Sequence, residues 1–127
     1  MDRTAITFAK RIVLKIGSSS LTGTAGSQLD SASVEKIVGV IASLKSRGAE
    51  VALVSSGAIA AGLAPLKLNS RPKDLPTQQA AASVGQGLLI ARYNEAFTKH
   101  SIVSSQVLLT TEDIVRRSHY QNAHQTL

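Results

Sequence analysis

The sequence predicts an α/β domain built on a mainly parallel sheet. Two short runs rich in branched aliphatic residues, 11–16 and 49–54, are typical of buried strands. An amphipathic helix lies between them, and the links are short enough for one strand–helix–strand unit. Such a unit joins parallel strands through a right-handed crossover. Both strands therefore end at the same edge of the sheet, where open α/β sheets bind their ligands.

The composition indicates a globular chain with an aliphatic core. Hydrophobic residues make up 43% of the 127 residues, but only two Tyr, two Phe and no Trp are present. The absence of Cys excludes a disulfide scaffold and a thiolate metal site. No apolar run approaches the roughly 20 residues that span a bilayer, and the first residues do not resemble a signal peptide. We therefore expect a cytoplasmic protein with no membrane partner.

The formal charge of +6 favours anionic ligands. The Lys and Arg residues are scattered along the chain, and the aromatic residues that would stack on bases are nearly absent. We do not expect this segment to bind nucleic acid.

The clearest helix is predicted over 30–47. Asp30 or Ser31 can cap its start, and Gly48 supplies the residue beyond its end. Its apolar stripe consists of Val34, Ile37, Val38, Ile41 and Leu44.

A short helix, about 58–63, follows the second strand, and three prolines then mark an exposed basic connection. Thr77 can cap a long helix that runs to about Lys99. Because the first half of this helix is nearly all small residues, another backbone can approach it closely. The remaining predicted elements are a third strand over 102–109, a helix capped by Thr110 or Thr111, and a helix over 120–127.

A first candidate anion site follows the first strand. Gly17 lets the backbone approach a phosphate, the N–H groups of Ser18 and its neighbours can surround it, and Lys15 adds a positive charge. The order of residues is not that of a Walker A loop. A plain loop with a solvated lysine is the alternative.

A second candidate site follows the second strand. The chain breaks at Ser55-Ser56-Gly57 and restarts as a helix at Ala58, which leaves backbone N–H groups unpaired at the positive end of the helix dipole. A helix cap without a ligand is the alternative. The Gly-x-Ser-x-Gly pattern of serine hydrolases is absent, and the three histidines lack metal-ligand spacing, so we predict no metal site.

These two loops resemble those of the amino acid kinase family. The residues that carry the resemblance are the strings Val-Leu-Lys-Ile-Gly-Ser-Ser-Ser-Leu at 13–21 and Val-Ser-Ser-Gly-Ala-Ile-Ala-Ala-Gly at 54–62. Further similarity lies at 79–86, at 106–110 and at 122–127, so nearly the whole of 10–127 is covered.

The resemblance implies a three-layer sandwich with a mainly parallel sheet, incomplete in this chain. It also implies ATP-dependent phosphorylation of the γ-carboxylate of L-glutamate, with ATP and Mg²⁺ as cofactors. By match to the family's motif, Lys15 contacts the transferring phosphoryl group as the catalytic lysine, while Gly17 and Ser18 contact the ATP phosphates. Ser56, with the amides of Gly57 and Ala58, holds glutamate.

Family members continue well beyond the length of this chain. We therefore expect a leader at 1–9 and the N-terminal portion of a kinase domain at 10–127, inactive by itself and homo-oligomeric when complete. Two other readings stay open: a family member with a different acceptor, and a non-catalytic binding or assembly module.

Overall fold

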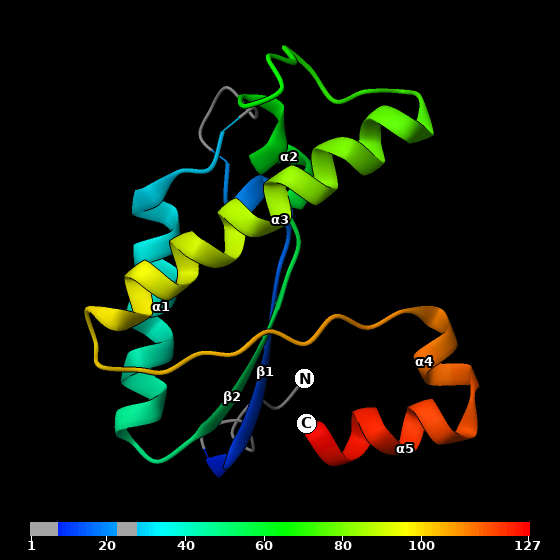
Figure 1. Ribbon diagram of the computed structural model, residues 1–127. Helices are drawn as coiled ribbons and strands as arrows, with labels where there is room; N and C mark the ends of the chain where they lie inside the picture. The colour runs from blue at the N-terminus through cyan, green and yellow to red at the C-terminus, as the bar shows by residue number, and fades with distance from the viewer. Residues whose placement is uncertain (1–7, 23–27) are drawn as a thin grey trace, which may run out of the picture.

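The computed structural model describes residues 8–22 and 28–127, so most of the predicted leader at 1–9 lies outside the described residues. The elements are strand β1 (Arg11–Ile16), the 3₁₀ turn η2 (Ser18–Ser20), helix α1 (Ser31–Ser46), strand β2 (Glu50–Ser55) and helices α2 (Ala58–Leu63), α3 (Leu75–Thr98), α4 (Thr111–Val115) and α5 (Arg117–Thr126) (Figure 1). The predicted strand–helix–strand unit is confirmed, because β1 and β2 pair in parallel and α1 connects them.

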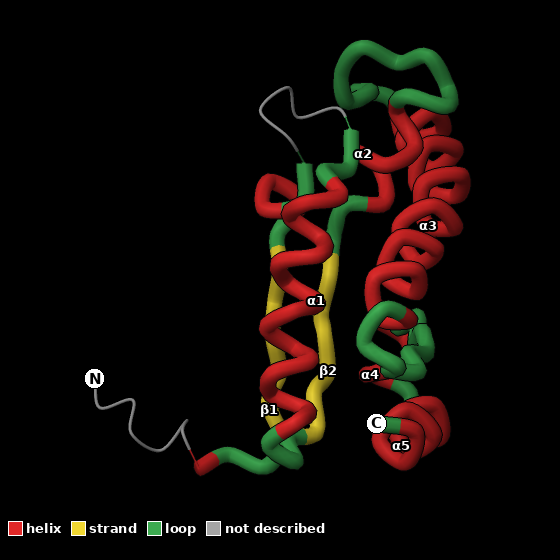
Figure 2. The backbone as a smooth tube through the Cα atoms, turned by 90° about the vertical axis from the view of Figure 1, so that its left-hand side faces the viewer, coloured by secondary structure: helices red, strands yellow, loops and turns green. Residues whose placement is uncertain are grey.

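Helix α1 covers one face of the two-stranded sheet (Figure 2). The strands pair with Leu14 opposite Leu53, and both side chains pack towards the core. Strand residues alternate between faces, and on the other face Val13 is 64% and Val54 52% exposed. The α/β class is thus confirmed, whereas a helix layer on this second face is not found in the described residues.

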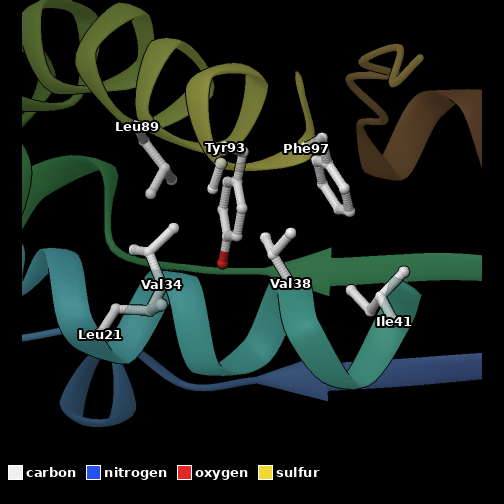
Figure 3. Packing of buried hydrophobic residues seen from close by; sticks show 8 residues of the cluster. Leu21, Val34, Val38, Ile41, Leu89, Tyr93 and Phe97 are labelled. Carbon is white, nitrogen blue, oxygen red and sulfur yellow. The ribbon is translucent and has the colours of Figure 1, made fainter. Parts of the chain in front are cut away.

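The core lies between α1, α3 and the covered face of the sheet. In Figure 3 the side chains of Leu89, Tyr93 and Phe97 point from α3 towards α1. Their neighbours in this cluster are Leu21, Val34, Val38, Ile41 and Ala96. The predicted stripe of α1 therefore faces the core, and it holds α3 in place beside the sheet.

The predicted boundaries of α1 are confirmed. Of the two candidate caps, Asp30 fills the role: its carboxylate accepts from the N–H groups of Ala32 and Ser33 at 3.3 and 3.1 Å. Gly48 follows the helix with a φ of +84°, a conformation that a side chain disfavours.

The predicted cap of α3 is wrong by three residues. Asp74, not Thr77, precedes the helix, and its carboxylate accepts from the N–H of Thr77 at 2.9 Å. Pro76 explains the earlier start, because its fixed φ suits the first turn of a helix and it needs no hydrogen-bond acceptor there.

The predicted third strand over 102–109 is not formed. This segment has no strand assignment, and Val103 is 97% exposed. A strand needs a neighbouring strand to receive its backbone hydrogen bonds, and the segment pairs with neither β1 nor β2. The helix after it forms as predicted: Thr110 precedes α4, and the Asp113 carboxylate accepts from its N–H at 2.7 Å. The predicted last helix is likewise confirmed as part of α5.

Candidate functional site

The two candidate loops lie side by side at the carboxyl edge of the sheet. The backbone N–H of Ser56 donates to the carbonyl of Ile16 at 3.1 Å, and the Ser56 hydroxyl donates to the same carbonyl at 3.2 Å. The end of β1 is thereby joined to the start of the second loop. The parallel pairing that the sequence predicts is what produces this proximity.

The first loop presents free backbone donors. Gly17 is extended, and the chain then makes the turn η2, closed by the Ser20 N–H on the Gly17 carbonyl at 3.1 Å. Within residues 8–22 and 28–127, the N–H groups of Ser18 and Ser19 have no hydrogen-bond acceptor. Such successive N–H groups favour an anion.

The second loop turns on a glycine. Gly57 has a φ of +118°, and its carbonyl accepts from the Ala61 N–H at 2.9 Å as α2 begins. A residue with a side chain would be strained at this φ. The N–H groups of Ala58, Ile59 and Ala60 precede the first helical hydrogen bond and have no acceptor in the described part of the chain.

Both loops line one open cleft of about 650 Å³. Its lining residues are Ser18, Ser19, Thr22, Ser55, Ser56, Gly57, Ala58, Ile59, Ala60, Leu63, Asn69, Ser70, Arg71 and Gln86. Of the predicted site residues, the cleft therefore brings together Ser18, Ser56, Gly57 and Ala58. Gly17 and Lys15 are not among the lining residues.

Lys15 projects from the uncovered face of the sheet. It pairs with Val54 in the register, and its side chain is exposed. Ser55 faces the core, and Ser56 follows the end of β2 with an exposed side chain. With strands about 4.8 Å apart and a rise of about 3.3 Å per residue, the register puts the Cα atoms of Lys15 and Ser56 about 8 Å apart. Lys15 therefore lies two register positions before Ser56, and its side chain is not part of the cleft lining.

Helix α3 supports the second loop at two points. A Cβ atom added at Gly85 would lie 1.8 Å from the carbonyl oxygen of Ala58, and one added at Gly62 would lie 2.0 Å from that of Ala81. The close backbone approach predicted from the small residues is thus confirmed.

The other support is polar. The hydroxyl of Tyr93 hydrogen-bonds to that of Ser55 at 2.9 Å. Burial raises the pKa of Tyr93, and the Ser55 hydroxyl offsets part of that shift. The phenol is therefore protonated at neutral pH and fixes the end of β2 from the core side.

Four polar lining residues outside the two predicted loops were missed by the sequence reasoning: Asn69, Ser70, Arg71 and Gln86. The first three belong to the connection between α2 and α3 (Figure 1), which thereby contributes to the lining of the cleft. Of the lining residues that the structure describes, Arg71 carries the charged side chain and none carries a carboxylate. The basic, proline-marked composition of this connection was the available signal, because a connection that leaves an anion-binding loop and carries cations can fold back over it.

The described residues hold no group of three or more His, Asp or Glu side chains arranged to bind a metal ion. In the same residues, no helix is long and apolar enough to cross a bilayer.

The sheet edge, its two donor-rich loops and the cleft form an anion-binding arrangement on an α/β fold. The family model described as "Amino acid kinase family" matches residues 10–127, and the chain belongs to this family. Among its relatives, the protein named glutamate 5-kinase from Salinispora arenicola is 60% identical over 125 residues, which are 98% of this chain and 34% of the relative. That from Streptomyces coelicolor is 57% identical over 98% of this chain and 33% of its own length. The chain thus spans about a third of the length of these relatives.

Proposed function

We propose that the chain carries the first part of the glutamate site and the phosphate-contacting lysine of an enzyme that phosphorylates the γ-carboxylate of L-glutamate with ATP. The observation that carries the proposal is the shared cleft: two donor-rich loops, 38 positions apart from Ser18 to Ser56, line the same cavity. The names of the relatives supply the substrate, which the geometry alone does not specify.

The first loop is assigned to ATP. The free N–H groups of Ser18 and Ser19 suit phosphate oxygens, Gly17 permits a close approach, and Lys15 is the catalytic residue that contacts the transferring phosphoryl group. Lys15 lies outside the cleft lining, which fits a group that reaches the phosphate from the neighbouring face of the sheet. The described residues do not fit a resident Mg²⁺ site, because no metal-binding cluster is found among them. Mg²⁺ is therefore proposed only as the ion that accompanies the nucleotide, and no step is assigned to it.

The second loop is assigned to glutamate. The amides of Gly57 and Ala58 offer donors to a carboxylate, and Arg71 gives the lining a positive charge. The Ser56 hydroxyl, which donates to the Ile16 carbonyl in the free chain, is proposed to turn to the ligand when glutamate binds. A glutamate side chain, with a pKa of about 4.3, is already ionised at neutral pH, so the attacking oxygen needs no general base. The demand on the protein is to hold two anions in line against their repulsion. Adjacent loops of donors with one nearby lysine meet that demand.

We further propose that 10–127 is the N-terminal portion of a three-layer kinase domain, cytoplasmic and homo-oligomeric in its complete form and inactive as this chain alone. The exposed Val13 and Val54 support the third layer, since they are apolar side chains on a face of the sheet that is uncovered in the described residues.

Turnover is tested in a chimera in which this chain replaces the matching part of the Salinispora arenicola relative. We expect glutamate-dependent ATP consumption, and Lys15→Ala to lower kcat by about 10²–10³, the loss that follows removal of one preorganised electrostatic contact. Lys10→Ala, at the opposite end of β1, is the matched control. Ser56→Ala is expected to raise KM for glutamate more than KM for ATP. Full turnover in the Lys15→Ala chimera would remove this residue from the mechanism.

The alternatives have their own tests. A panel of amino acids offered to the chimera distinguishes another acceptor from glutamate. A chain that binds neither glutamate nor ATP and forms a defined oligomer by light scattering would favour an assembly module.

A further inference from the structure

Gln86 lies where α3 meets the second loop. Its neighbour Gly85 packs directly against the backbone of Ala58, with no room for a side chain between them, and Gln86 lines the cleft. The position of this side chain is therefore set by one of the closest backbone contacts in the molecule. No other residue of α3 lines the cleft.

The side-chain amide of Gln86 is half-buried but unused. No hydrogen bond joins it to any residue in 8–22 or 28–127, and no polar side-chain atom there is buried without a partner. Its polar atoms therefore remain accessible from the cleft. By contrast, Gln78 on the same helix donates to the carbonyl of Pro72 at 3.0 Å.

The other lining residues of the cleft determine which kind of ligand group it favours. Among the described residues it has no carboxylate side chain, carries Arg71 and includes backbone N–H groups without an acceptor, so an anionic group is favoured. A carboxamide next to such donors adds one more N–H to the same anion. We infer that Gln86 is a substrate-binding residue whose Nε2–H donates to a carboxylate of the bound amino acid. This inference rests on the proposed function, because it takes glutamate as the ligand.

The experiment follows L-glutamate binding to the 127-residue chain by ¹H–¹⁵N NMR. Glutamate is expected to shift the side-chain NH₂ signals of Gln86 along the same saturation curve as the backbone amide of Gly57. Gln86→Ala should raise Kd about tenfold, since a hydrogen bond to a charged group is lost. Gln86→Glu should raise Kd further, because the new side chain has nearly the same shape but replaces the N–H donor with a carboxylate, which repels the carboxylate of the bound glutamate. Gln79→Ala, a change of the same residue type outside the cleft, should leave Kd within about twofold.

The outcomes distinguish a failure of the role of Gln86 from a failure of the proposed function. If glutamate binds the unaltered chain and Gln86→Ala behaves like Gln79→Ala, the role of Gln86 is overturned and the proposed function stands. If Gln86→Glu binds as tightly as the unaltered chain, the donor assignment is wrong. If glutamate shifts no signal of either loop at millimolar concentration, the glutamate site and the role of Gln86 fall together. Thermal unfolding of each variant, expected within a few degrees of the unaltered chain, shows that a loss of binding is local.

Discussion

Different interactions stabilise two regions of the molecule, residues 11–98 and residues 102–127. Every buried residue of the described chain lies in the first region, where α1, α3 and the sheet share a core. The second region, which we call the arm, has no buried residue, and α4 and α5 contact mainly each other. Its helices depend on local hydrogen bonds such as that between Thr110 and Asp113. Burial therefore stabilises the first region, while the arm is near the low end of local stability.

The largest expected effect tests this difference with one substitution at two leucines. Leu89 is 3% exposed in the core, and Leu108 is 72% exposed in the arm. Leu89→Ala should lower the free energy of unfolding by about 3 kcal/mol, through lost burial and the cavity left behind. Leu108→Ala should change it by less than about 0.5 kcal/mol. Urea unfolding of both variants measures the contrast, and equal losses would mean that the arm belongs to the same cooperative core.

The next largest effect is expected at the contact between α3 and the second loop. Gly85→Ala puts a methyl group into the backbone of Ala58, so α2 and α3 must separate. We expect a loss of about 2 kcal/mol in the free energy of unfolding and altered NMR signals of Gly57 and Ala58. Gly87→Ala is the matched control, because nothing lies within 4 Å of its added Cβ. That variant should be neutral or up to about 1 kcal/mol more stable, since alanine favours a helix. If Gly85→Ala and Gly87→Ala have the same free energy of unfolding, the contact between Gly85 and Ala58 can adjust to the added methyl group at little cost in stability.

The same division explains what the sequence could predict. Helix α1 with a cap at Asp30 or Ser31, and a helix capped by Thr110 or Thr111, follow from signals a few residues apart. The structure confirms both helices and selects Asp30 and Thr110 as the caps. The segment 102–109 has the apolar content of a strand, but a strand forms only with a partner from elsewhere in the chain. Local composition could not show that this partner was missing.

The candidate site likewise has a part that the sequence predicts and a part that it does not. The pairing of β1 with β2 is a consequence of one short crossover, so the meeting of the Ser18 and Ser56 loops could be predicted. Composition indicated a basic α2–α3 connection, but the positions of Arg71 and Gln86 in the cleft could not be predicted. They depend on the path of that connection and on the close packing of Gly85 against Ala58. These are three-dimensional contacts between segments whose spacing along the chain has no fixed pattern.

A smaller effect is expected at the polar contact between the core and the cleft. Tyr93→Phe removes the hydroxyl that Ser55 bonds at 2.9 Å and keeps the ring, which stacks on Phe97. The loss should be about 1 kcal/mol, the net contribution of one hydrogen bond. Ser55→Ala removes the same bond from the other side. In a double-mutant cycle the two losses should not add, because each change alone breaks the interaction. Strict additivity would mean that the hydroxyls act independently.

The smallest effect is a pH dependence that arises at helix caps in the first region. Hydrogen bonds from Ser33 lower the pKa of Asp30 below its ordinary value of 3.8, and those from Thr77 lower the pKa of Asp74 in the same way. A carboxylate with a lowered pKa binds fewer protons in the folded than in the unfolded state. Its contribution is therefore complete above about pH 4 and is lost as the pH falls through the lower folded pKa.

Asp30→Ala should accordingly cost up to about 1 kcal/mol at pH 7, the usual contribution of an N-cap. As the pH falls towards 2, the difference between Asp30→Ala and the unaltered chain should shrink, since protonation of the carboxylate in the folded state removes the contribution of its charge. Thermal unfolding at the two pH values measures the change, and Glu112→Ala, on the arm, provides a comparison at a carboxylate that caps no helix. A difference for Asp30→Ala that stays constant from pH 7 to pH 2 would show that the hydrogen-bonding shape of this side chain, and not its charge, stabilises the start of α1.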